Sequence, residues 1–71
     1  MENTRITTPQ EKEILEYLNG LRNSGETNMF GAGPYVAERF DLDKHEARKF
    51  VSFWMDNFNE EGNYETVKRN N

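Results

Sequence analysis

One amphipathic helix constrains this chain more than any other feature of its sequence. Between Lys44 and Asn59, apolar side chains recur at the three- and four-residue spacing of a single helical stripe. Asp43 precedes this helix as a predicted N-cap, and Glu46 three residues later completes a capping box. Gly62-Asn63 is expected to end it. The stripe consists of Ala47, Phe50, Val51, Trp54, Met55 and Phe58.

A shorter helix is predicted just before it, over Pro34–Phe40. Proline suits the first helical position, where its missing N–H has no helical acceptor. Only three residues, including the apolar Leu42, separate the two helices. Leu42 is expected to fill the angle between them. The small side chains of Ala37 and Ala47 would let the helices cross closely.

These two helices resemble the helix-turn-helix family of DNA-binding motifs. That family has a small residue in the first helix, apolar residues before and within the turn, and further apolar residues after it. The chain departs from the pattern at Asp41, where the family usually has glycine because φ is positive, although aspartate tolerates that region better than most residues. The resemblance covers about a third of the chain, residues 34–58. The matching residues are Val36, Ala37, Phe40, Leu42, Ala47 and Phe50.

The remaining chain predicts one more helix and two extended ends. Pro9–Asn23 reads as a helix, with Thr8 as N-cap, Glu11 closing a capping box and Gly25 ending it. Short strands are expected over residues 5–7 and 64–67, and the two could pair. The predicted fold class is therefore all-α: a small three-helix bundle with a helix-turn-helix and, as an option, a minor terminal strand pair. The N-terminal stripe consists of Ile14, Leu15, Leu18 and Leu21.

Length and composition narrow the class of protein. The 71 residues predict a single domain, 1–71, with an ordered core over about 8–67. There are no cysteines, so no disulfide or thiolate metal site is expected. No apolar run approaches a membrane span and no signal-peptide core is visible, which predicts a cytoplasmic protein. An aromatic centre is predicted from Phe30, Phe40, Phe50, Trp54 and Phe58.

No catalytic, metal or cofactor site is predicted. His45 is the only histidine, and no partner nucleophile or metal shell is visible by spacing. Asp41, Asp43 and Glu46 lie close in sequence but lack the spacing of a calcium loop, so capping explains them better. A non-enzymatic protein is therefore expected.

Two functions are compatible with these features. The resemblance implies a small DNA-binding protein that regulates transcription, working as a dimer because one short module gives limited affinity. Its recognition surface would be the outer side of the last helix, although Asp43 and Glu46 would repel phosphate and a merely solvated face is the alternative. The predicted nucleic-acid contacts are Lys44, His45, Arg48, Lys49 and Ser52.

The second function is an acidic adaptor or modulator that binds another protein and no DNA. A net charge of −4 favours this reading, because nonspecific DNA binding needs a basic face. In size and charge the chain is similar to small accessory proteins of bacteria and phages. Exposed aromatic and apolar residues would form the contact, while burial under the N-terminal helix or folding back on the core is the alternative. The candidates are Tyr17, Met29, Phe30, Tyr35 and Phe53.

Overall fold

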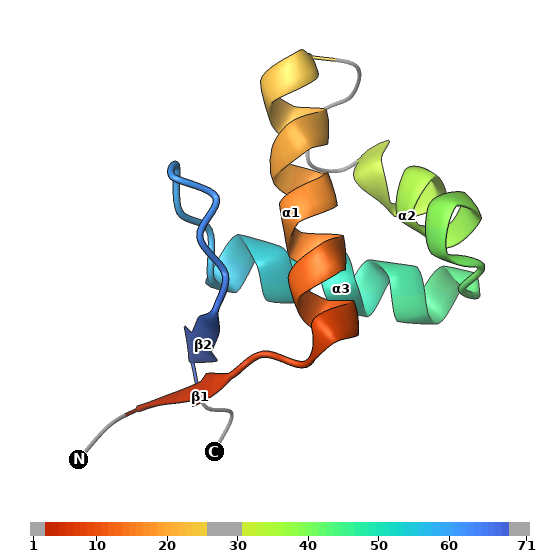
Figure 1. The fold of residues 1–71 in the computed structure, drawn as a ribbon. Coiled ribbons are helices and arrows are strands. Elements are labelled where there is room, and N and C mark those ends of the chain that lie inside the picture. Colours follow the sequence, from red (N-terminus) through yellow and green to blue (C-terminus); the bar gives the residue numbers. More distant parts are fainter. Residues whose placement is uncertain (1–2, 26–30, 69–71) are drawn as a thin grey trace.

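The computed structural model describes residues 3–25 and 31–68. In this part of the chain, three helices follow one short strand in sequence and precede a second, and the two strands pair side by side (Figure 1). Helix α1 stands across α3, with α2 on one side and the strand pair on the other (Figure 1). The predicted all-α class, with three helices and a minor strand pair, is confirmed. The elements are β1 (Thr4–Ile6), α1 (Pro9–Ser24), α2 (Ala32–Phe40), α3 (Lys44–Asp56) and β2 (Thr66–Lys68).

Helix α1 begins and ends as its sequence predicts. The Thr8 hydroxyl accepts from the Glu11 N–H at 3.2 Å, and the Glu11 carboxylate accepts from the Thr8 N–H at 2.9 Å. These two bonds form the predicted capping box. Gly25 follows the last residue with φ 73°, a left-handed conformation that glycine adopts without steric penalty. The helix extends one residue beyond the predicted Asn23.

Helix α2 begins at Ala32, two residues before the predicted start at Pro34. Pro34 still falls in the first turn, where no backbone N–H has a helical acceptor. The helix ends where Asp41 takes a left-handed conformation with φ 53°, which the sequence anticipated. The Leu42 N–H then bonds back to the Ala37 carbonyl at 2.9 Å, and the Leu42 side chain packs against the core.

Helix α3 starts as predicted but ends early. Asp43 accepts a bond from the Glu46 N–H at 2.9 Å, as predicted, but the Glu46 side chain makes no return bond to Asp43, so the predicted capping box is only half formed. The predicted end at Asn59, with Gly62-Asn63 as the stop, is wrong, because the helix ends at Asp56. Asn57 explains the difference. Its side chain donates to the Phe53 carbonyl at 2.9 Å and accepts from the Lys68 N–H at 2.8 Å, which ties the end of α3 to β2.

The centre of the core differs from the predicted aromatic cluster. Trp54 and Tyr64 are the two largest fully buried side chains in the described ranges, and Tyr64 comes from the segment after α3. Phe30 lies outside the described residues. The other predicted members, Phe40, Phe50 and Phe58, are only partly buried around this centre. Sequence periodicity missed Tyr64 because that residue belongs to no helical stripe.

The two strands pair antiparallel, as predicted, but β1 begins one residue earlier and β2 two residues later than predicted. Ile6 is opposite Thr66, and Arg5 is opposite Val67. Val67 faces the core and is buried, whereas Ile6 is 80% exposed. Over residues 3–25 and 31–68, no helix combines the length and the apolar character needed to cross a membrane.

Candidate functional site

The exposed face of α3 carries every predicted nucleic-acid contact. Buried Ala47, Val51 and Trp54 define the inner side of the helix. At 100° per residue, His45, Lys49 and Ser52 lie close to the opposite side. Lys44 and Arg48 lie on the side toward α2. Each member of the predicted set is exposed on α3: Lys44, His45, Arg48, Lys49 and Ser52.

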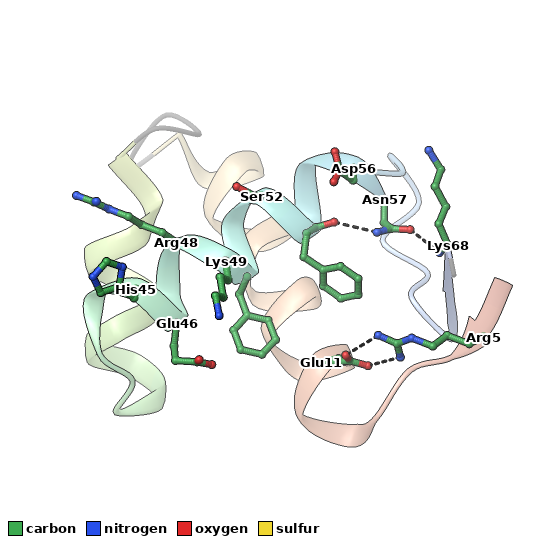
Figure 2. Close-up of a pocket in the computed structure, with 12 residues that line it drawn as sticks. Arg5, Glu11, His45, Glu46, Arg48, Lys49, Ser52, Asp56, Asn57 and Lys68 are labelled. Atoms are coloured by element: carbon green, nitrogen blue, oxygen red, sulfur yellow. Dashed lines mark hydrogen bonds and ion pairs between the residues drawn. The ribbon is translucent and has the colours of Figure 1, made fainter. Parts of the chain in front are cut away.

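A hollow of about 700 Å³ lies over this face and extends to the strand pair. Figure 2 shows His45 and Arg48 toward one end of the hollow, and Arg5 and Lys68 toward the other. Neither Arg5 nor Lys68 was among the predicted site residues. Pairing of the chain ends was predicted, but the Asn57 bond that brings β2 beside α3 leaves no pattern in the sequence.

Charges in this hollow are close to balanced, on a protein whose net charge is −4. Glu46 comes from the first turn of α3 and Asp56 from its last residue. Both carboxylates would face an anionic ligand seated against α3. The lining consists of the cationic Arg5, Arg48, Lys49 and Lys68, the anionic Glu11, Glu46 and Asp56, and the neutral His45, Phe50, Ser52, Phe53 and Asn57.

Arg5 is neutralised by a carboxylate of the same hollow. Its guanidinium makes two parallel bonds to Glu11, both of 2.8 Å. This fork-to-fork pairing is the strongest geometry for an arginine–carboxylate contact. The Arg5 hydrogen bond lowers the pKa of the Glu11 carboxyl below its ordinary value, and the same bond raises the pKa of Arg5. The Arg5–Glu11 pair therefore carries no net charge, and Arg5 attracts an external anion less than an unpaired arginine would.

The cations of α3 differ from Arg22 and Arg39, which lie on the other two helices. Arg22 lies over the Phe58 ring at 4.7 Å, and Arg39 lies over the rings of Phe40 and Tyr17. By contrast, the positively charged groups of α3 make no side-chain hydrogen bond, ion pair or ring contact within the described residues. They belong to Lys44, Arg48 and Lys49, and they are therefore available to an external anion.

A second groove of about 890 Å³ separates α2 from α3. Pro34, Ala37, Val51 and Met55 give it an apolar lining. Arg48 lines both this groove and the hollow, so the two depressions adjoin. The remaining lining residues are Gly33, Glu38, Lys44 and Ser52.

The aromatic residues of the protein-binding alternative differ in exposure. Tyr17 is half-buried, and its ring contacts that of Phe40 edge to face at 5.5 Å. Phe53 is also half-buried and lies beneath the Arg5 guanidinium. Tyr35 is 40% exposed. The two other candidates, Met29 and Phe30, lie outside the described residues.

Among residues 3–25 and 31–68, no group of three or more metal-binding side chains is placed to hold an ion. No protein-family model, curated protein or solved structure matches the chain. The geometry and charge of α3 therefore carry the functional interpretation.

Proposed function

We propose that this protein is a non-enzymatic regulator that binds duplex DNA, with α2 and α3 acting as a helix-turn-helix. In this proposal α3 enters the major groove and its exposed face contacts phosphates and base edges. One observation carries the proposal. The side chains of Lys44, Arg48 and Lys49 are all exposed on α3 and have no partner within the described residues.

The local shape supports the same reading. A three-residue turn joins α2 to α3, and Asp41 takes the left-handed conformation that the motif requires there. An α-helix with its side chains is about 10–12 Å across, and the major groove is about 12 Å wide. The face that would enter the groove carries the polar side chains of α3, with the half-buried Phe50 and Phe53 beside them, because most of the apolar stripe is turned toward the core.

The overall negative charge does not prevent such binding. At physiological salt the screening length is about 8 Å, so carboxylates further away contribute little at the interface. Each cation that neutralises a phosphate releases a counterion, and three such contacts predict a slope of about −3 for log K against log salt. Binding is therefore expected to be weak for one copy and strongly dependent on salt.

Protein binding without DNA is the second candidate. Exposed Tyr35 favours it, as does the apolar groove between α2 and α3. On this reading Tyr35→Ala would weaken the complex, whereas Arg48→Ala and Lys49→Ala would change little.

An amide-shift titration with mixed-sequence duplex DNA tests the first candidate. Salt-sensitive shifts confined to residues 44–52 are expected, and Arg48→Ala with Lys49→Ala should reduce affinity at least about tenfold without changing the fold. Lys12→Ala is the control, since it removes one charge from a residue that lines neither the hollow nor the groove. The absence of shifts even at low salt would exclude DNA binding through α3.

A further inference from the structure

The outer edge of β1 carries an exposed apolar side chain. Ile6 is 80% exposed, more than the other large apolar residue on the described surface, Tyr35. Its cross-strand neighbour Thr66 is exposed as well, so this face of the strand pair is open to solvent. Arg5 and Val67 occupy the opposite face, toward α3 and the core.

The backbone of β1 also presents unpaired groups. The Thr7 N–H donates to the Glu65 carbonyl at 3.0 Å. Thr7 is therefore in a hydrogen-bonded pair with Glu65. Hydrogen-bonded pairs alternate along an antiparallel ladder, so the backbone groups of Arg5, two residues before Thr7, also point toward β2. Those of Thr4 and Ile6 then point away from β2, along the free edge. Of these groups, the Ile6 carbonyl accepts one bond from the Arg5 guanidinium, at 3.3 Å.

The outer edge of β2 is held against the end of α3 at Lys68. The Lys68 N–H, which points away from β1, donates to the Asn57 side chain at 2.8 Å. Asn57 is held in turn by its bond to the Phe53 carbonyl. Natural proteins protect an exposed strand edge with charge, proline or covering groups. Here Asn57 binds the Lys68 N–H of β2, whereas on β1 the outward N–H groups of Thr4 and Ile6 have no partner among the described residues.

We propose that this edge pairs with the same edge of a second copy, giving a two-fold dimer with a four-stranded antiparallel sheet. Centred on Arg5, the pairing sets Thr4 opposite the partner's Ile6. In this register each Thr4–Ile6 pair exchanges both of its N–H···O bonds, so every outward-pointing group of β1 gains a partner. The exposed Ile6 side chains then lie on one face, diagonal to each other.

Charge favours a second copy in this register. Two arginines directly opposite each other across a sheet would normally repel. Each Arg5 is already neutralised by two bonds of 2.8 Å to its own Glu11, so two β1 strands meet as an uncharged pair. The same fork turns the Arg5 side chain away from the face that carries Ile6.

The contact between the two copies is short, so the dimer is expected to be weak. Three residues of strand bury far less than the roughly 1,200 Å² of a standard interface, so a dissociation constant of about 0.1–1 mM is expected. Two copies on neighbouring half-sites have an effective concentration in the millimolar range, which makes such a contact sufficient for cooperative binding. This inference deepens the proposed function, but it concerns the free protein and is tested without DNA.

Sedimentation velocity and amide shifts, recorded from about 0.02 to 1 mM of the 71-residue protein, test the proposal. Concentration-dependent shifts are expected at Thr4 and Ile6, together with a rising dimer fraction. Ile6→Lys should weaken self-association at least tenfold, because it places a charge on the paired face. Thr4→Pro should do the same by removing an outward N–H. Thr66→Lys, which adds the same charge on β2, should change self-association less than twofold.

Two results would overturn the dimer. The first is a monomer at every concentration, which leaves the edge to an extended segment of another protein. The second is self-association that Ile6→Lys and Thr4→Pro leave unchanged while their circular dichroism melts match the parent. Arg48→Ala with Lys49→Ala separates the two proposals, because it should abolish DNA binding and leave dimerisation intact. The dimer can therefore fail while DNA binding stands, and the reverse.

Discussion

In the interior of the protein, the indole N–H of Trp54 donates to the side-chain oxygen of Asn19 at 2.6 Å. The Tyr64 hydroxyl bonds to the same oxygen. The Asn19 amide nitrogen donates to the Asn59 carbonyl at 2.9 Å. One buried amide thus joins α1, α3 and the segment after α3. No buried side-chain nitrogen or oxygen among the described residues lacks a partner, so the cluster specifies a single arrangement of these elements.

Replacing Asn19 with leucine should therefore destabilise the protein. The change removes the shortest of the bonds to the Asn59 carbonyl, which keeps the Gly62 N–H at 3.2 Å, and it takes one acceptor each from Trp54 and Tyr64. We expect the free energy of unfolding to fall by about 1–3 kcal/mol, measured by urea denaturation. The control is Asn23→Leu on the exposed side of α1, which should stay within about 0.5 kcal/mol. Equal effects of the two changes would show that the buried cluster adds no stability.

The Arg5–Glu11 fork predicts a dependence of stability on acid. Because the folded protein lowers the pKa of Glu11, the carboxylate stabilises the fold above its unfolded pKa of about 4.3. That stability is lost as the pH falls through the lower folded value. The melting temperature of the parent should exceed that of Glu11→Gln at pH 7, and the difference should vanish in acid. Glutamine keeps an oxygen for the Thr8 N–H but loses the charge and the second Arg5 bond, so the comparison reports the fork as a whole. A difference that is constant with pH would contradict this.

The sequence predicts the helix starts and the Asp41 turn well, and the end of α3 and the segment after it poorly, for physical reasons. Caps act locally, and Thr8 and Asp43 start their helices as predicted. The α3 face was also predictable, because the apolar stripe fixes which side chains point outward. The end of α3, by contrast, depends on Asn57 and on β2, eleven residues later. Contacts over such separations leave no periodic pattern, so the buried Tyr64 and the Arg5 and Lys68 side of the hollow were not predicted.

Asp41 offers a test of the turn between α2 and α3. Its left-handed conformation, with φ 53°, costs most residues about 1–2 kcal/mol relative to glycine. Asp41→Ala should therefore lower the free energy of unfolding by about 1 kcal/mol, whereas Asp41→Gly should match or exceed the parent. Urea denaturation of the three proteins measures the order. If alanine were as stable as glycine, the turn in solution would not hold a left-handed residue at this position.

The carboxylates on the α3 face give the last prediction, which concerns affinity. Glu46 is exposed in the first turn and lines the same hollow as Arg48 and Lys49. If DNA phosphates approach this face, the charge of Glu46 opposes binding, and Glu46→Gln should tighten it about two- to threefold at low salt. The gain should shrink as salt is added, because screening weakens the repulsion that was removed. Fluorescence anisotropy with a labelled duplex measures both effects.

Glu16→Gln on the exposed side of α1 is the matched control, since it changes the net charge equally on a helix outside the α2–α3 unit. It should alter affinity less than Glu46→Gln does. Weaker binding of Glu46→Gln to one sequence alone would indicate that the carboxylate accepts a bond from a cytosine amino group. Equal effects of the two changes would mean that affinity depends only on the total charge of the protein. That result would contradict the proposal that α3 faces the DNA.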